Sequence, residues 1–130
     1  MNIQKEQDDH GKRQAKAQIE SIIEMVEALD TENEEEREAA ITAIHEDPLS
    51  VEVRSGWYYP GEDNKPEEFR IMLCWGGPAC QIVGDIDEHN QPINPVLQYQ
   101  DWGTNWTDYP LTMKEGAALL TYCQQFYFEN

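Results

Sequence analysis

Apolar positions between residues 12 and 46 recur every three or four residues, the period of an α-helix with one buried face. The first series contains Ala15, Ile19, Ile22, Ile23, Val26 and Leu29, and the second contains Ala40, Ile41 and Ile44. Between them, Thr31 and Glu34 have the spacing of a capping box, and Pro48 stops the second helix. No Gly or Pro lies in 12–47, so the pattern permits one long bent helix or a hairpin broken near residues 30–33. We expect the hairpin, because it suits a compact domain better.

After Pro48 the apolar period changes to two residues, which is typical of half-buried strands. Strands are predicted at 51–59, 69–73, 79–86 and 93–100, separated by turn-forming segments. Pro92 and Pro95 lack an amide hydrogen, so the last strand is expected at the edge of the sheet. These spacings predict a four-stranded antiparallel β-meander.

A helical period returns over residues 113–127, and Thr112 with Glu115 has capping-box spacing. Its predicted buried face contains Ala117, Leu120, Cys123, Gln124 and Tyr127. The predicted fold is therefore α+β: an N-terminal helical hairpin, or one long bent helix, then the meander, then a C-terminal helix packed on one face of the sheet. Residues 1–11 are polar and contain a glycine, so we expect a flexible tail before a single domain over residues 12–130.

The segment "LCWGGPAC", residues 73–80, contains two cysteines around a Gly-Gly-Pro turn. A three-residue loop would place Cys74 opposite Cys80, whereas a two-residue Gly-Gly turn pairs Leu73 with Cys80. The two-residue turn puts Ile71 and Ile82 on one face, and we favour it because it buries both. In that register Cys74 and Cys80 point to opposite faces and form neither a disulfide nor a shared metal site.

The charge is strongly negative, with 26 acidic residues, 9 basic residues and a formal net charge of −17. Such a chain repels nucleic acids and anionic membranes, so we expect no direct contact with either. No apolar run is long enough to span a membrane or to act as a secretory signal, and the three cysteines are an odd number. We therefore expect a cytoplasmic protein with free thiols.

Recognisable catalytic motifs are absent, since the chain has no H-E-x-x-H, no G-x-S-x-G and no glycine-rich phosphate loop. The acidic segment 85–89 departs from a calcium loop because no glycine follows it and Ile86 belongs to a strand. We expect no enzyme, no cofactor and no metal site.

The acidic residues concentrate on the second predicted helix, which includes Glu34, Glu35 and Glu38, and in the loop that contains Glu62 and Asp63. Carboxylates three or four residues apart on a helix lie about 5–6 Å from each other, a spacing comparable to that of phosphates along nucleic acid. The aromatic residues form the other prominent group, which includes Trp57, Trp102 and Trp106. They either cap one end of the core or form a docking patch.

Three stretches, "DPLSVEVRSGW" (47–57), "EFRIMLCWGGPACQIVGDID" (68–87) and "LQYQDWGTNWTDY" (97–109), resemble a family of small acidic proteins of unknown function. Phages and plasmids of proteobacteria carry that family, and the resemblance spans residues 15–128. By analogy with other small acidic proteins of such elements, it implies an anti-CRISPR or antirestriction inhibitor that mimics nucleic acid.

The expected partner is the basic nucleic-acid-binding surface of a host defence nuclease, with a CRISPR effector favoured. The five acidic residues named above would supply charge, and the three tryptophans would anchor the complex. The alternatives are an accessory protein-interaction module that docks through its aromatic end and an enzyme acting on sugars or nucleotides.

Overall fold

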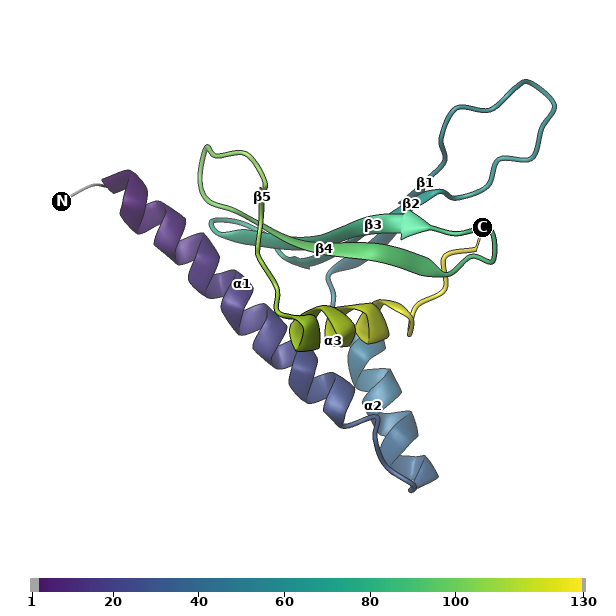
Figure 1. The fold of residues 1–130 in the computed structure, drawn as a ribbon, viewed down its shortest axis with the longest axis horizontal. Helices are drawn as coiled ribbons and strands as arrows, with labels where there is room; N and C mark the ends of the chain where they lie inside the picture. The colour runs from purple at the N-terminus through teal and green to yellow at the C-terminus, as the bar shows by residue number, and fades with distance from the viewer. Residues whose placement is uncertain (1–2, 130) are drawn as a thin grey trace.

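The computed structural model describes the backbone of residues 3–129 and the side chains of residues 10–129. Its elements in chain order are α1 (Ile3–Glu27), α2 (Glu34–Glu46), β1 (Ser50–Arg54), β2 (Glu68–Cys74), β3 (Ala79–Ile86), β4 (Pro92–Gln100), β5 (Thr107–Asp108) and α3 (Met113–Cys123). The fold is α+β, with α1 and α3 against one face of an antiparallel sheet (Figure 1).

The sheet has five strands in the order β1-β2-β3-β4-β5, one more than expected. The additional strand β5 is a two-residue strand that pairs with Gln98 and Tyr99, so β4 is not an edge strand along its whole length. Pro95 lies in the part of β4 that has no partner on β5, where its missing amide hydrogen breaks no ladder. Five of the nine residues predicted for the first strand, including Trp57, lie in the loop 55–67 instead, because β1 ends where its pairing with Glu68 ends.

The N-terminal helices form a hairpin rather than one long helix, and α1 begins at Ile3, well before the predicted boundary at residue 12. Gly11 is buried in α1 against the side chains of Tyr99 and Asp101. Residues 3–11 therefore belong to α1, residues 1 and 2 lie outside the described residues, and the flexibility expected for the tail stays a prediction.

The N-cap of α2 is Asn33, whose Oδ1 atom accepts from the amide of Glu36 at 3.1 Å. The predicted capping box of Thr31 and Glu34 is wrong, because the Thr31 hydroxyl instead bonds the Asn33 amide and the Glu36 carboxylate. The second predicted capping box is confirmed: the Glu115 amide donates to Thr112 Oγ1 at 3.2 Å. The Glu115 carboxylate in turn accepts from the Thr112 amide at 2.9 Å.

The hydrophobic core lies between the sheet and the two helices that cover it. Its fully buried members include Ile19, Ile22, Ile71, Ile82, Leu97, Leu119, Tyr122 and Phe128. The buried face of α3 consists of Ala118, Leu119, Tyr122 and Cys123, so the predicted face was correct only at Cys123. Because α3 ends at Cys123, Tyr127 lies beyond the helix and is exposed.

The pairing of β2 with β3 follows the register of the two-residue turn for most of its length, with Ile71 opposite Ile82. A β-bulge at Leu73 then shifts the register, and Cys74 lies opposite Cys80. The expectation that these cysteines point to opposite faces is wrong, because residues directly opposite in an antiparallel pair share a face. The turn closes through Gly76, whose φ of 116° suits a residue without a side chain.

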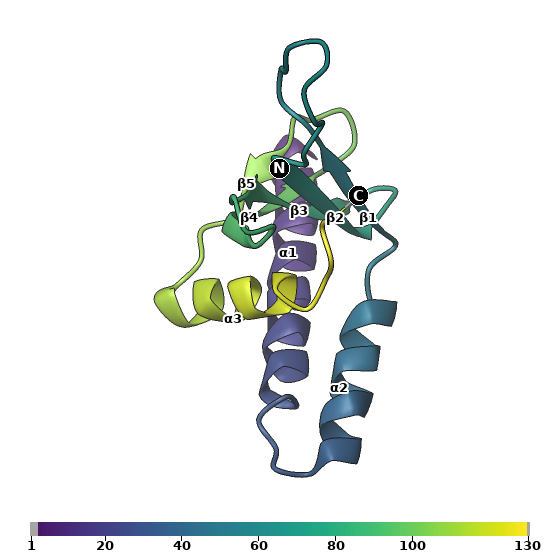
Figure 2. The same ribbon diagram turned by 90° about the vertical axis from the view of Figure 1, so that its right-hand side faces the viewer.

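Two parts of the molecule project beyond the sheet in opposite directions (Figure 2). The end of α1, the connection to α2 and most of α2 extend on one side, and the loop 55–67 extends on the other. Within the described residues, none of the helices has a stretch long and apolar enough to cross a membrane.

Candidate functional site

The projecting helical segment 20–47, which we call the acidic hairpin, carries eleven of the 26 acidic residues and a single Lys or Arg, Arg37. All eleven acidic side chains are exposed. They are Glu20, Glu24, Glu27, Asp30, Glu32, Glu34, Glu35, Glu36, Glu38, Glu46 and Asp47. The acidic hairpin is therefore a concentrated source of negative potential at one side of the molecule.

The C-terminal half of α2 is anchored to the rest of the fold. Ile44 is fully buried, and the Tyr122 hydroxyl of α3 donates to Asp47 Oδ2 at 2.8 Å. The ring of His45 lies 5.6 Å from that of Phe126, and its Nε2 atom is hydrogen-bonded to the carbonyl of Gln125. These contacts fix the direction in which α2 projects.

The N-terminal half of α2 presents its carboxylates to solvent. Among the described residues, Glu34, Glu35 and Glu38 have no hydrogen-bond or ion-pair partner. Glu34 and Glu35 lie in the first turn, where the helix dipole favours negative charge and offsets part of their mutual repulsion. Arg37 donates to the carbonyl of Thr31 and so holds the connection between the helices.

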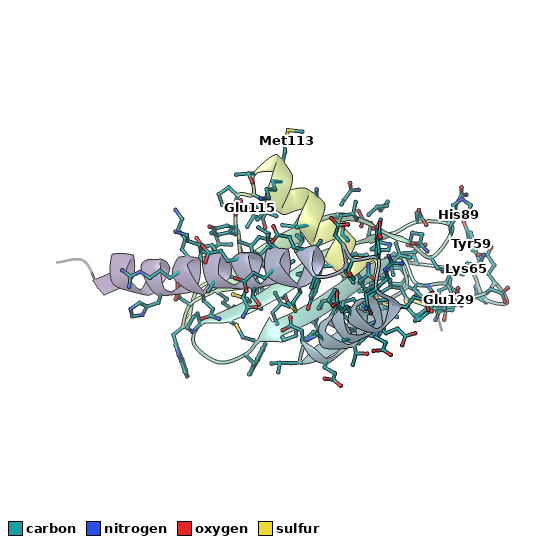
Figure 3. All side chains as sticks on the ribbon, turned by 90° about the horizontal axis from the view of Figure 1, so that it is seen from below. Tyr59, Lys65, His89, Met113, Glu115 and Glu129 are labelled. Carbon is teal, nitrogen blue, oxygen red and sulfur yellow. The ribbon has the colours of Figure 1, made fainter. Side chains whose placement is uncertain are left out.

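The two other predicted acidic residues, Glu62 and Asp63, are exposed in the loop 55–67. That loop lies on the opposite side of the sheet from α2, so the structure does not bring the two acidic groups together (Figure 2). Figure 3 shows Tyr59 and Lys65 of this loop at the same end of the molecule as His89, which lies in the β3–β4 turn. The amide of Ile86 donates to the carbonyl of Glu67 at 2.8 Å and joins the loop to β3.

The predicted aromatic residues occupy three separate places. Trp57 is fully exposed in the loop 55–67, and Trp102 is 76% exposed, so neither caps the core. The Trp102 indole lies over the backbone of Gly77, in the turn that follows the exposed Trp75. Since the β1–β2 loop and the β2–β3 turn lie at opposite ends of β2, Trp57 and Trp102 form no common patch.

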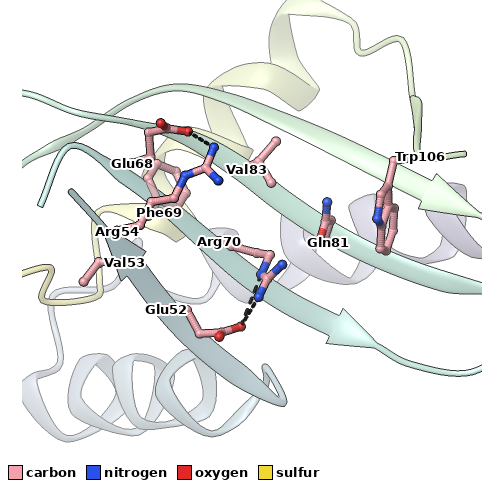
Figure 4. A pocket seen from close by; sticks show the side chains of 9 residues that line it. All are labelled: Glu52, Val53, Arg54, Glu68, Phe69, Arg70, Gln81, Val83 and Trp106. Carbon is pink, nitrogen blue, oxygen red and sulfur yellow. Dashed lines mark hydrogen bonds and ion pairs between the residues drawn. The ribbon is translucent and has the colours of Figure 1, made fainter. Parts of the chain in front are cut away.

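Trp106 is half-buried and lines a hollow of about 500 Å³ on the sheet face that α1 and α3 leave uncovered (Figure 4). Two ion pairs cross this face, Arg70 with Glu52 at 2.9 Å and Arg54 with Glu68 at 2.8 Å. The hydrogen bond to Glu68 and the charge of its carboxylate raise the pKa of Arg54 above its ordinary value.

Gln81 also lines the hollow; it is buried, and its Nε2 donates to Gln98 Oε1 at 2.8 Å. Its Oε1 has no hydrogen-bond partner within the described part of the chain. Sequence reasoning missed this hollow, because it depends on the side chain of Trp106 reaching the sheet from the β4–β5 loop.

Over residues 10–129, no group of three or more His, Cys, Asp or Glu side chains is arranged to hold a metal ion.

In comparisons with known proteins, no family model, curated protein or solved structure matches the chain. The resemblance to acidic phage and plasmid proteins stays a prediction.

Proposed function

We propose that the protein is a non-catalytic anti-defence inhibitor, of the anti-CRISPR or antirestriction kind, that binds the basic nucleic-acid-binding surface of a host nuclease complex. The observation that carries the proposal is the acidic hairpin, with eleven exposed carboxylates and one arginine on a projecting pair of helices. Opposite charge at this density accelerates association and selects a basic partner.

The arrangement of the carboxylates supports mimicry of a phosphate backbone. Glu20 and Glu24 on α1, and Glu34 and Glu38 on α2, are four residues apart, which places each pair about 5–6 Å apart on one helix face. Burial of Ile44 and the hydrogen bond from the Tyr122 hydroxyl to Asp47 hold α2 in place. Binding of a partner therefore does not carry the entropic cost of ordering the helix.

The proposed contact surface lies on one side of the molecule. A partner that covers α2 with a single surface does not reach Glu62 or Asp63, because the loop 55–67 projects in the opposite direction. We therefore assign the primary charge contact to Glu34, Glu35 and Glu38 and their neighbours on the acidic hairpin.

The test adds the purified protein to a panel of CRISPR effectors and restriction endonucleases and measures whether their DNA cleavage is inhibited. For each enzyme that is inhibited, the Kd of its complex with the protein is then measured. The variant Glu34→Gln/Glu35→Gln/Glu38→Gln removes three charges from the acidic hairpin. The matched control, Glu62→Gln/Asp63→Asn/Glu67→Gln, removes three charges from exposed positions of the opposite loop.

We expect the hairpin variant to weaken binding at least about tenfold, the control to change it little, and the wild-type Kd to rise steeply with salt. Equal weakening by both variants would show that binding depends on the net charge and not on the position of the charges. An unchanged Kd in the hairpin variant would contradict the proposed surface. Failure to inhibit any nuclease in the panel would count against an anti-defence role.

A second candidate function, an accessory protein-interaction module, is favoured by the exposed aromatic loop. Trp57 is fully exposed and Tyr59 is 77% exposed, and both residue types are common in interface hot spots. Docking through these rings would be weakened by Trp57→Ala and would change little with salt, which distinguishes it from binding through the acidic hairpin.

A further inference from the structure

Cys74 and Cys80 face each other across the end of the β2–β3 hairpin. The β-bulge at Leu73 makes them direct partners in the ladder, and both are free thiols. Residues directly opposite in an antiparallel pair have Cα atoms about 4.5–5.5 Å apart, within the range of about 4.4–6.8 Å that a disulfide spans. The backbone therefore already places the two cysteines at bonding separation.

The surroundings make the two thiols unequal. Cys80 is fully buried, whereas Cys74 is half-buried and its Sγ lies 3.9 Å from the carbonyl oxygen of Pro78. A hydrogen bond from Cys80, with smaller contributions from the side chains of Gln14 and Gln18 on α1, lowers the pKa of Cys74 to about 7. The same pairing, with burial, raises the pKa of Cys80, and nearby Asp101 raises it further.

We propose that Cys74 and Cys80 are a hydroperoxide-reactive thiol pair, with Cys74 as the attacking sulfur and Cys80 as the resolving sulfur. With hydrogen peroxide, the thiolate of Cys74 attacks one oxygen, the O–O bond breaks, and Cys74 becomes a sulfenic acid while hydroxide leaves and takes up a proton to form the first water. The Cys80 thiol then loses its proton and attacks the Cys74 sulfur. The S–O bond breaks, a second water leaves, and a Cys74–Cys80 disulfide remains, so the two thiols supply the two electrons that reduce the peroxide.

The third cysteine provides an internal contrast. Cys123 lies on the buried face of α3 and is fully buried, and this burial raises its pKa. A buried thiol with a raised pKa reacts poorly with peroxide from solution, and this holds for both Cys80 and Cys123. Cys80 differs because it lies directly opposite Cys74 and can attack a sulfenic acid formed there. Cys123 lies on α3 instead, so it is expected to stay reduced while the pair reacts.

The experiment treats the purified chain with hydrogen peroxide, unfolds it in denaturant, blocks the remaining thiols by alkylation, and maps the cysteines by mass spectrometry. We expect a mass decrease of two hydrogens, a peptide cross-linked through Cys74 and Cys80, and alkylation of Cys123 alone. The variant Cys123→Ala should form the same cross-link. Cys80→Ala should instead accumulate a Cys74 sulfenic acid, which dimedone traps, and Cys74→Ala should consume little peroxide.

A peroxide-treated wild type without the Cys74–Cys80 cross-link, or with Cys123 oxidised first, would overturn the proposal. A second measurement does not depend on disulfide formation: the rate of Cys74 alkylation by iodoacetamide against pH, in proteins shown to be folded by circular dichroism. Its midpoint should lie near pH 7 in Cys123→Ala and shift upward in Cys80→Ala/Cys123→Ala, which lacks the thiol donor. Equal midpoints in the two variants would show that the sulfurs do not interact and would also overturn the proposal.

Discussion

The substitution Phe128→Ala tests whether the segment after α3 belongs to the core. Phe128 is 1% exposed, and its ring centroid lies 4.9 Å from that of Phe69 on β2, with the rings inclined by 40°. Truncating a buried Phe costs about 3–5 kcal/mol, and tilted ring pairs contribute part of that cost. Phe128 lies outside helix and strand, so its surroundings can partly close around the cavity. We therefore expect Phe128→Ala to lower the free energy of unfolding by about 3 kcal/mol.

Urea unfolding followed by circular dichroism measures this loss. With a slope of about 1–3 kcal/mol/M, the midpoint should fall by roughly 1–3 M while the slope stays constant. The neighbouring substitution Tyr127→Ala is the matched control, because Tyr127 is 88% exposed and its removal should change the free energy of unfolding by less than about 0.5 kcal/mol.

The two variants distinguish the packing seen in the structure from the packing that the helical period of the sequence predicts. The period extends the last helix to residue 127 and places Tyr127 on its buried face, so it predicts the opposite order of stability losses. A loss below about 1 kcal/mol for Phe128→Ala, or a larger loss for Tyr127→Ala, would refute the packing described here.

Three further substitutions test individual contacts by the same unfolding assay. Tyr122→Phe removes the bond to the exposed carboxylate of Asp47 and should cost about 1 kcal/mol, because water can solvate the freed carboxylate. Burial raises the pKa of Tyr122, which favours its neutral form in the folded state, so the wild type should lose stability more steeply than this variant as the pH rises above about 10. Gly84→Ala should cost about 1–3 kcal/mol. The reason is that the new Cβ would lie 2.6 Å from the ring of Phe69, and a loss within error would show that this ring can move. Arg70→Ala breaks an ion pair whose side chains are each 51% exposed, so a loss above about 0.5 kcal/mol at either low or high salt would contradict the expected solvent screening.

The sequence by itself determined the parts of this protein that depend on local patterns. The periods of three to four residues and of two residues gave the α+β class and the paired body of β2 and β3, in which Ile71 lies opposite Ile82. They permitted both one long N-terminal helix and a hairpin, and the structure has the hairpin. The spacing of Thr112 and Glu115 gave the N-terminus of α3, because both hydrogen bonds of a capping box form within four residues.

Tertiary structure alone decided the features that depend on partners distant in the chain. The buried face of α3 is set by packing against α1 and the sheet, and β5 exists because the β4–β5 loop returns to Gln98 and Tyr99. A single extra residue at Leu73 left the body of the β2–β3 hairpin unchanged yet brought Cys74 opposite Cys80. The sequence likewise showed how many acidic residues the chain has, but the path of the backbone separated Glu34, Glu35 and Glu38 from Glu62 and Asp63. Local periodicity indicates which residues are apolar and suited to burial, whereas long-range packing determines which residues are in contact.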